Sequence, residues 1–377
     1  MNQRTTARIN LSAIERNCQR LQAALGDEAS LCAVVKADGY GHGIVPVAQA
    51  ALAGGASWLA VAAVSELEEL RAAGIAGRIL VMGAMNDAEL ERAVVADGDV
   101  AVWRESTVRR LGALTPPGSQ TGVHVKLDTG MGRLGTRDPV EARRVALTAA
   151  ELPTVKLVGL MTHFATADDL SDEFFDLQLE RFSEFVSGVK PVAHTLYVHA
   201  ANSAALLRES GARFDLARCG IAIYGLDPYN TDPREQELEP ALELCSYVAE
   251  VKPCAAGESA GYGRKFIAAT DTEIATVPIG YGDGYQRALS GKSEVLVNGQ
   301  RFPLAGTVSM DNITVDLGLN SGVKPGDQVV LIGSQGEELI TAEELALLAG
   351  TINYEIATGI TRRVPRNYHH DGIPAQP

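Results

Sequence analysis

Cysteine is scarce in this sequence, and its spacing supports neither a disulfide framework nor a zinc site. The 377 residues include five cysteines, an odd number, and no two of them stand in a C-x-x-C arrangement. Disulfide-stapled domains and structural zinc sites both depend on such patterns. We therefore expect reduced thiols and predict no metal ligands.

Long apolar runs and an excess of basic side chains are missing as well. No stretch approaches the length of a membrane span, and the first residues lead into no apolar signal region. The 33 basic and 47 acidic side chains give a net charge of −14, which disfavours nucleic acid and anionic membranes as partners. We expect a cytoplasmic protein with no membrane or nucleic-acid partner, in which any anion site is built locally.

The chain is long enough for two domains, because 377 residues exceed what a single core usually supports. Its first part contains eight short apolar runs separated by amphipathic stretches, namely Leu31–Val35, Trp58–Ala62, Ile79–Met82, Val100–Trp103, Val123–Leu127, Leu157–Met161, Thr195–His199 and Phe214–Ala217. Non-alternating strands that alternate with helices are typical of a (β/α)8 barrel. A doubly wound parallel sheet is the competing architecture.

Amphipathic patterns between these runs predict the helices. We expect them at Val64–Ala73, with Ser65 as its N-cap, and at Arg104–Leu114, Pro139–Ala150 and Asp172–Val189. An α/β barrel of this kind places its chemistry at the C-terminal ends of several strands.

Polar residues do follow several of the runs, which favours the barrel over an open sheet with one switch point. They are Lys36 after the first run, Asp128 and Arg133 after the fifth, His163 after the sixth, His199, Asn202 and Ser203 after the seventh, and Arg218 after the eighth. Taken singly, Asn202–Ser203 and Asp128–Thr129 are as well explained as helix caps, and His163 as a buried core histidine. Near the last two runs, Asn202–Ser203 and Gly220–Ile221 offer hydroxyl, amide and backbone donors suited to a phosphate group.

Lys36 is the central candidate because it ends the buried run Leu31–Val35 and is followed by Gly39, Gly41 and Gly43. An ammonium group is costly in an apolar setting, so the pKa of the amine falls or the amine forms a covalent bond, such as an imine with a carbonyl cofactor. A solvated lysine at a strand end is the alternative. The glycines form no G-x-G-x-x-G, so a dinucleotide site is not supported.

The pattern changes near residue 235, and we place the boundary there, with a barrel at 1–235 and a mainly β domain at 236–377. The second domain is expected to contain strands at Leu242–Val251, Glu273–Val277, Glu294–Val297, Arg301–Gly306, Ile313–Leu317 and Gln328–Ile332. Asn298–Gly299 predicts a type I′ hairpin, and Thr341 with Glu344 predicts a capping box for a helix through Leu348. The last residues, with His369 and His370, have the character of a frayed tail.

Four motifs make the chain resemble the bacterial alanine racemases, pyridoxal-phosphate enzymes built from a barrel and a β domain. They are AVVKADGYGHG at 33–43, VKLDTGMGRLG at 125–135, AGYGR at 260–264 and GTVSMD at 306–311. The resemblance covers essentially the whole length. It implies an isomerase that interconverts L- and D-alanine and supplies D-alanine for peptidoglycan.

The resemblance also implies roles around the cofactor. Lys36 would carry pyridoxal phosphate as an imine and exchange the α-proton on the D-alanine face, and Tyr262 would be the opposing base for L-alanine. His163 would contact Tyr262, while Arg218, held by His199, would face the pyridine nitrogen and keep it unprotonated. The remaining cofactor-binding positions are Tyr40, Asn202, Ser203, Gly220, Ile221 and Tyr354.

Substrate contacts and assembly follow from the same resemblance. Arg133 and the Met310 backbone N–H would bind the alanine carboxylate, with Tyr281 and Asp311 nearby. Lys126 matches a lysine that is often carbamylated, which would give Arg133 an anionic partner. The resemblance implies a homodimer in which each active site is completed by the other subunit.

Three alternatives remain open. A non-catalytic pyridoxal-phosphate carrier would lack a β domain and would have no use for Tyr262. A decarboxylase of basic amino acids on this fold would need an acidic partner for the pyridine nitrogen, where Arg218 stands. Serine, or a broader substrate range, is also possible because excluding one small group is worth only ~1–3 kcal/mol.

Overall fold

The structure is a computed structural model that describes residues 4–189, 196–208 and 210–375. It divides into two compact units, each of which is described by itself. The barrel unit contains Ile14–Gly39 and Ile44–Ile223, and the β unit contains Met1–Ala13, Tyr40–Gly43 and Tyr224–Pro377. The boundary expected after residue 235 stays a prediction. Among the described residues, no helix combines the length and the apolar character needed to cross a membrane.

The barrel unit is built on eight parallel strands that pair in the order β8-β7-β6-β5-β4-β3-β2-β9. Their bounds are β2 (Ser30–Val34), β3 (Trp58–Val61), β4 (Arg78–Val81), β5 (Asp99–Val102), β6 (Thr121–Lys126), β7 (Val155–Met161), β8 (Tyr197–His199) and β9 (Leu216–Cys219). All eight predicted strands are present; Thr195, the expected start of β8, lies outside the described residues. Because β2 pairs with both β3 and β9, the strands form a nearly closed barrel, and the predicted barrel is confirmed against the open sheet.

Backbone hydrogen bonds bridge the remaining gap between β8 and β9. The Asp215 N–H donates to the Val198 carbonyl at 3.0 Å, and the Arg218 N–H donates to the Ala201 carbonyl at 2.9 Å. The chain around the C-terminal ends of these two strands is therefore tied together, and these are the strands that carry His199 and Arg218.

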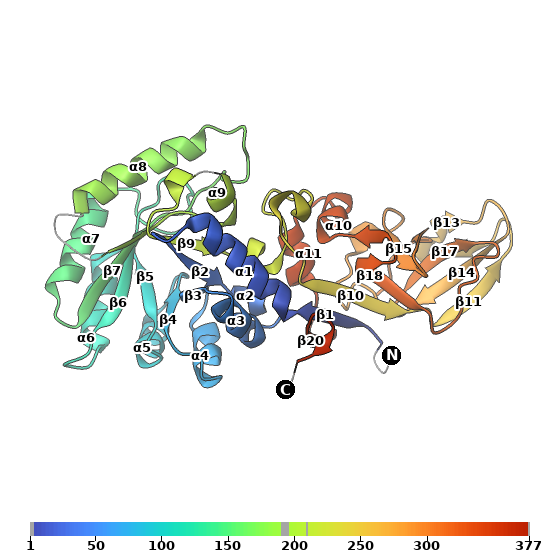
Figure 1. The fold of residues 1–377 in the computed structure, drawn as a ribbon, viewed down its shortest axis with the longest axis horizontal. Coiled ribbons are helices and arrows are strands. Elements are labelled where there is room, and N and C mark those ends of the chain that lie inside the picture. Colours follow the sequence, from blue (N-terminus) through green and yellow to red (C-terminus); the bar gives the residue numbers. More distant parts are fainter. Residues whose placement is uncertain (1–3, 190–195, 209, 376–377) are drawn as a thin grey trace. The chain divides into compact units, whose positions relative to one another are not determined.

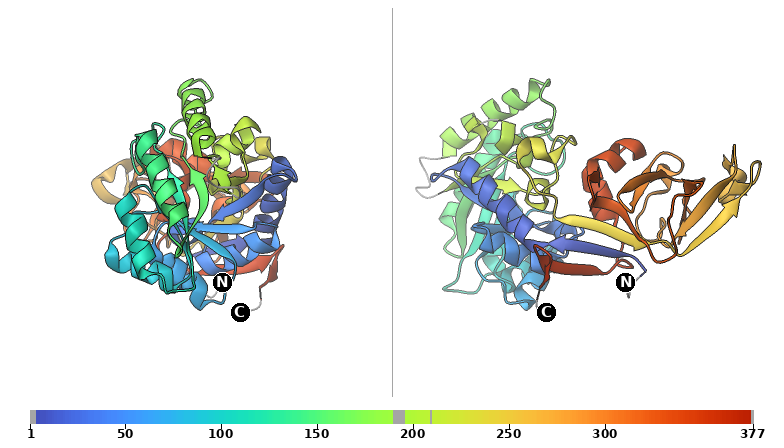
Figure 2. Two further views of the ribbon diagram at one scale, coloured as in Figure 1. Left: turned by 90° about the vertical axis from the view of Figure 1, so that its left-hand side faces the viewer. Right: turned by 45° about the vertical axis from the view of Figure 1, so that its right-hand side comes forward.

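Helices lie outside the ring of strands (Figure 1, Figure 2). They are α1 (Leu11–Leu25), α3 (Ile44–Ala53), α4 (Val64–Ala72), α5 (Asp87–Val95), α6 (Glu105–Leu114), α7 (Pro139–Glu151), α8 (Phe174–Val189) and α9 (Ser203–Arg208). Their buried faces follow the helical period; α8, for example, buries Phe175, Phe182 and Phe185. The four helices expected from the sequence are present, each with bounds within two residues of the prediction.

The expected cap of α4 was wrong. The helix begins at Val64 with Ala63 at the N-cap position, so Ser65 lies inside the first turn. The Glu66 carboxylate takes the capping role, accepting hydrogen bonds from the N–H groups of Ala62 and Ala63 at 2.8 and 3.0 Å. A carboxylate three residues into a helix can reach back to these N–H groups, which a serine one residue earlier cannot.

The β unit contains an eight-stranded sheet, a three-stranded sheet and a two-stranded ribbon. The large sheet follows the order β16-β15-β18-β10-β1-β20-β21 with β19 beside β18, the small sheet is β11-β14-β17, and the ribbon is β12-β13. The strand bounds are β1 (Thr6–Asn10), β10 (Leu242–Tyr247), β11 (Glu250–Cys254), β12 (Ser259–Ala260), β13 (Phe266–Ile267), β14 (Thr272–Val277), β15 (Glu294–Val297), β16 (Gln300–Pro303), β17 (Ile313–Gly318), β18 (Gln328–Gln335), β19 (Glu338–Ile340), β20 (Arg366–His370) and β21 (Ile373–Pro374). Two short helices lie between β19 and β20 in the chain, α10 (Ala342–Ala349) and α11 (Asn353–Gly359).

Of the local predictions for this unit, the hairpin and the helix cap at Thr341 are confirmed, whereas the full capping box does not form. The type I′ hairpin is confirmed, because Asn298 and Gly299 have φ values of 51° and 78° between the paired residues Val297 and Gln300. Thr341 caps α10 by accepting the Glu344 N–H at 3.0 Å. The Glu344 carboxylate binds Arg301 at 2.8 Å instead of completing the capping box.

Two predictions for this unit were wrong, one for a strand and one for the C-terminal tail. Neither segment carries a local sequence signal for the structure it adopts. The run Leu242–Val251 is divided between β10 and β11, which belong to different sheets. The expected frayed tail was wrong, because Arg366–His370 forms β20 and pairs in parallel with β1. That pairing joins the two ends of the chain, and neither end shows it alone.

Candidate active site

Lys36 stands at the start of a left-handed turn. The segment α2 (Lys36–Tyr40) follows β2 directly, and Ala37, Asp38 and Gly39 have φ values of 54°, 54° and 59°. Successive left-handed residues other than glycine are strained and persist only where the surroundings impose them. Here the Gly39 N–H donates to the Val35 carbonyl at 2.9 Å, and the Asp38 carboxylate accepts the Ile44 N–H at 3.0 Å.

The Lys36 amine is half-buried, and its pKa is lowered. Burial is the main cause, and the positive charge of Arg133 adds to it, while the Glu66 carboxylate opposes it. The same carboxylate accepts the Ala37 N–H at 2.6 Å, so Glu66 joins the first turn of α4 to the turn that carries the lysine.

Arg218, on β9, is buried and held by a set of acceptors. Its Nη1 donates to the His199 Nδ1 at 2.8 Å and to the His199 carbonyl at 2.9 Å. Its Nη2 donates to the carbonyls of Thr162 and Ala200 at 2.7 and 3.0 Å, and lies 3.4 Å from the His163 Nδ1. These contacts occupy both terminal nitrogens, whereas Nε has no acceptor among the described residues. Burial lowers the pKa of Arg218 to about 10.

A second buried histidine continues this arrangement into the barrel. The His124 Nδ1 lies 2.8 Å from the His199 Nε2, and His124 has no solvent exposure. Gly159 lies opposite His124 on β7, and a Cβ at Gly159 would stand 2.5 Å from the His124 Nδ1. The neighbouring strand therefore needs glycine here to leave room for the imidazole. Burial lowers the pKa of His124 to about 4.

Lys126, at the end of β6, lies among cations that lower its pKa. Burial is the largest cause, and Arg218, Arg133 and Lys36 add to it, so the pKa of Lys126 is about 8. Burial and the same cations hold the pKa of the neighbouring His163 well below its usual value. This concentration of positive charge within a chain of net charge −14 suits an anionic ligand.

Arg133 is exposed on a glycine-rich loop that Asp128 organises. The Asp128 carboxylate accepts the N–H groups of Gly130 and Gly132 at 3.1 and 3.0 Å. Burial raises the pKa of Asp128, but these hydrogen bonds and the nearby Arg137 outweigh it and leave the pKa below its usual value. Asp128 therefore folds this loop and caps no helix.

The predicted phosphate-binding residues of the barrel unit do gather at one place. The Ser203 Oγ accepts the Gly220 N–H at 3.1 Å and the Ala222 N–H at 3.4 Å. The Ile221 N–H, between them, has no acceptor among the described residues. Asn202 caps α9 by accepting the Ala205 N–H at 2.9 Å. Helix capping was the alternative to phosphate binding that the sequence left open for this residue.

The other predicted site residues belong to the β unit. Tyr40 and Tyr354 lie together, with ring centroids 6.1 Å apart, and Tyr40 also stacks on Tyr224 at 4.9 Å. Tyr262 begins the 3-10 helix η5 (Tyr262–Arg264) and is 73% exposed. Its carbonyl accepts a hydrogen bond from the Thr307 hydroxyl at 3.1 Å, which ties it to the segment that leads to Met310.

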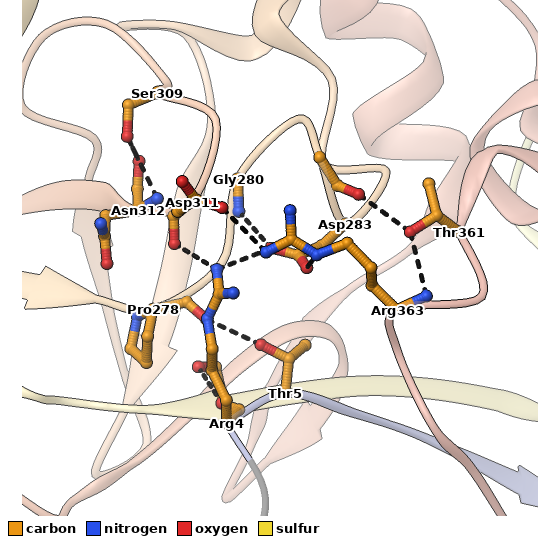
Figure 3. Close-up of polar contacts among 12 residues, drawn as sticks. Arg4, Thr5, Pro278, Gly280, Asp283, Ser309, Asp311, Asn312, Thr361 and Arg363 are labelled. Carbon is orange, nitrogen blue, oxygen red and sulfur yellow. Dashed lines mark hydrogen bonds and ion pairs between the residues drawn. The ribbon is translucent and has the colours of Figure 1, made fainter.

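Tyr281, Met310 and Asp311 lie on two loops that backbone hydrogen bonds join; Figure 3 shows Asp311 together with Gly280 of the other loop. The Tyr281 N–H donates to the Ser309 carbonyl at 3.0 Å, and the Gly282 N–H donates to the Met310 carbonyl at 2.9 Å. Tyr281 and Met310 both have large side chains, and these two residues are 42% and 51% exposed. The structure thus brings these three predicted substrate residues together.

Several residues that shape these sites carry no functional signal in the sequence. Glu66 and His124 contact the barrel residues, and Arg4, Asp283 and Arg363 hold the loops around Met310. His124 lies in mid-strand, where a histidine has no distinguishing pattern. Arg4 and Arg363 stand about 360 positions apart in the sequence, and only the folded sheet brings them near the same carboxylate.

Comparisons with known proteins agree over the whole chain. The family model for the alanine racemase N-terminal domain matches residues 9–228, and that for the alanine racemase C-terminal domain matches residues 241–368. The alanine racemase of Symbiobacterium thermophilum is 43% identical over 376 residues, covering 97% of each chain. Alanine racemase 1 of Bacillus subtilis is 41% identical over 377 residues, covering 98% of this chain and 94% of that one.

Solved structures show the same likeness. The alanine racemase of Streptomyces lavendulae superposes with a TM-score of 0.93 at 37% identity, covering 98% of each chain. The Bacillus anthracis alanine racemase, solved with bound L-Ala-P, superposes with a TM-score of 0.91 at 39% identity, covering 100% of this chain and 97% of that one.

Proposed function

The chain belongs to the alanine racemase family, whose reaction interconverts L- and D-alanine, and we propose that Lys36 and Tyr262 are its two proton-transferring bases. Racemisation through a planar carbanion needs a proton carrier on each face. Lys36 suits one face because burial and Arg133 lower its pKa and so favour the neutral amine. Tyr262 offers an exposed phenol for the other face.

The cofactor of the proposed reaction is pyridoxal phosphate, and the barrel residues fit it. When bound, it supplies an electron sink for the carbanion. Lys36 would hold it through its amine, and Arg218, whose Nε has no acceptor among the described residues, would donate to its ring nitrogen. Since guanidinium is a donor that keeps its proton, such a contact would favour an unprotonated ring nitrogen. Asn202, Ser203, Gly220 and Ile221, with Tyr40 and Tyr354 of the β unit, bind the phosphate in this proposal.

The substrate carboxylate is bound by Arg133 and by the Met310 N–H, with Tyr281 and Asp311 beside it. Lys126 supports Arg133 in carbamylated form. This modification needs a neutral amine, and a pKa of about 8 leaves roughly a tenth of the amine neutral at pH 7, far more than at its usual value. The observation that carries the proposal is the group of four cations, Lys36, Lys126, Arg133 and Arg218, in which both lysines have a lowered pKa.

His163 and His199 position these groups. His163 lies beside Arg218 and in the proposal also contacts the phenol of Tyr262. His199 holds Arg218 through two hydrogen bonds. From the family resemblance we further propose a homodimer with composite sites that acts in the cytoplasm and supplies D-alanine for peptidoglycan.

The surroundings of Arg218 argue against a decarboxylase, and the presence of the β domain argues against a non-catalytic carrier. A decarboxylase of this fold needs an acid at the ring nitrogen, and the carboxylate-free surroundings of the Arg218 terminal nitrogens offer none. A non-catalytic carrier would have no need for the β domain, which the family model matches over residues 241–368. Serine racemisation remains the second candidate, since one hydroxyl is weakly excluded by a small pocket.

The test is to incubate the cofactor-loaded protein separately with L-alanine and L-serine and follow the enantiomer ratio by chiral chromatography. The proposal expects alanine to reach a ratio of one, with serine slower. A cofactor-loaded protein that changes neither amino acid would contradict it.

A further inference from the structure

Asp283 has a buried carboxylate that contacts donor groups from three separate segments of the β unit. It is 3% exposed. Its Oδ2 accepts hydrogen bonds from the Gly280 N–H at 3.0 Å and from the Arg4 Nη2 at 2.9 Å. Its Oδ1 forms an ion pair with the Arg363 Nε at 3.2 Å. Figure 3 shows the two guanidinium groups converging on this carboxylate. Because a buried carboxylate is stable only when its oxygens are paired, this geometry is strongly specified.

The same two arginines also hold Asp311. The Arg363 Nη2 donates to the Asp311 Oδ1 at 2.8 Å, and the Arg4 Nη2 donates to the Asp311 carbonyl. Each guanidinium therefore links Asp283 to the loop at 309–312. The Asp311 Oδ1 is paired with Arg363, so Asp311 helps to fix the loop on which it lies beside the proposed substrate site.

Backbone pairing completes the connection between the two loops. The residues at 281 and 282 donate to the carbonyls of Ser309 and Met310. A Cβ at Gly280 would stand 2.2 Å from the Ser309 carbonyl oxygen, so the close approach requires glycine. Ser309 further closes its own loop by hydrogen bonds with Asn312, the N–H of Ser309 donating to the Asn312 carbonyl at 3.0 Å.

The two loops pair the carbonyl of Met310 but leave its N–H without an acceptor among the described residues. Its carbonyl is occupied by the Gly282 N–H, whereas its own N–H has no acceptor in the part of the chain that the structure describes. Met310 lies at the surface, with 51% of the residue exposed, and its N–H is the donor of this loop that we assign to an anion. A fixed, unclaimed backbone donor binds an anion without a reorganisation cost.

We propose that Arg4, Asp283 and Arg363 are positioning residues that hold the Met310 N–H in place for the substrate carboxylate. This inference rests on the role proposed above for Met310 and adds three residues that act through it. Lysine cannot replace Arg363, because one ammonium lacks the two separated nitrogens that reach Asp283 and Asp311 together.

The experiment compares Arg363→Lys with Arg362→Lys, in the cofactor-loaded protein. Arg362 is the adjacent exposed arginine and makes no hydrogen bond or ion pair with any described residue, so it is a matched control. We would measure kcat and KM for L-alanine, and the dissociation constant of propionate by calorimetry. Propionate carries the carboxylate of alanine without its amine, so its binding reports this contact without turnover.

For Arg363→Lys we expect KM and the propionate dissociation constant to rise by about the same factor, roughly 10-fold, with kcat within about twofold, as for loss of one hydrogen bond made equally before and during the reaction. Arg362→Lys should match the wild type. Arg4→Lys, which loses the shared contact to Asp283 and Asp311, should shift both constants in the same direction. Thermal unfolding of each variant identifies general loss of structure.

A kcat loss with unchanged KM and unchanged propionate binding would overturn the inference, as would equal behaviour of the two arginine variants. Failure of the proposed function gives a different result, because a wild type that binds propionate without racemising alanine would contradict the activity alone. Propionate affinity in Arg363→Lys would then still decide the positioning role.

Discussion

The Arg218 Nη1 donates to the His199 Nδ1 at 2.8 Å, and this contact fixes the direction of a buried chain of hydrogen bonds. Guanidinium has no acceptor, so the His199 Nδ1 must be unprotonated and the proton of the neutral ring must be on Nε2. That proton is donated to the His124 Nδ1 at 2.8 Å. His124 in turn must carry its own proton on Nε2, which has no hydrogen-bond partner among the described residues.

We therefore predict that both imidazoles are neutral Nε2–H tautomers near neutral pH. Nitrogen-15 NMR of histidine-labelled protein distinguishes protonated from unprotonated ring nitrogens. His124→Gln and His199→Gln variants assign the two sets of signals. A protonated Nδ1 in His199 would contradict the direction of the chain.

Acid should destabilise the protein through His124. Its pKa is about 4 in the folded protein and 6.5 ordinarily, so between these values the unfolded chain binds a proton that the folded chain does not. The contribution is present above pH 6.5 and is lost as pH falls towards 4, by about 3 kcal/mol. Urea unfolding over this range should give a steeper loss for wild type than for His124→Gln. Parallel curves would show that His124 does not titrate this way.

Lys36 should be the attachment point of the cofactor. Borohydride reduction followed by intact-mass measurement should add the mass of one pyridoxal phosphate to the wild type. The same treatment of Lys36→Ala should add none, because the variant lacks the amine. Lys126→Ala removes another lysine from the same cationic group and serves as the control. An unchanged mass gain in Lys36→Ala would remove Lys36 from the centre of the account.

Lys126 should form a carbamate. With a pKa of about 8, its neutral fraction rises as pH increases through that value. Carbon-13 NMR in labelled bicarbonate should show one carbamate signal that grows with pH and is absent from Lys126→Gln. Lys156, an exposed lysine on β7, provides the control Lys156→Gln. A signal that persists in Lys126→Gln would assign the modification elsewhere.

The barrel was predictable because its strands are buried on both faces and so form continuous apolar runs. All residues of β3 and β5, for instance, are buried. Lys36 was recognisable because it interrupts such a run directly before a set of glycines. The left-handed φ values of Ala37 and Asp38 were not predictable, since neither residue favours that conformation.

The failures share a physical cause, which is dependence on distant partners. The tail at Arg366–His370 becomes a strand only because β1 lies beside it. Glu66 lies in the first turn of α4, yet its carboxylate also accepts the Ala37 N–H from the turn after β2. His124 and Asp283 matter through contacts with residues 75 or more positions away, and no local pattern contains that information.

The two-base assignment is tested most directly by Tyr262→Phe in deuterated water. The α-proton of L-alanine and that of D-alanine are followed by NMR in separate incubations with the cofactor-loaded variant. The account predicts that D-alanine still exchanges its proton through Lys36, while L-alanine does not and no racemisation occurs. Exchange of both enantiomers together with continued racemisation would contradict it.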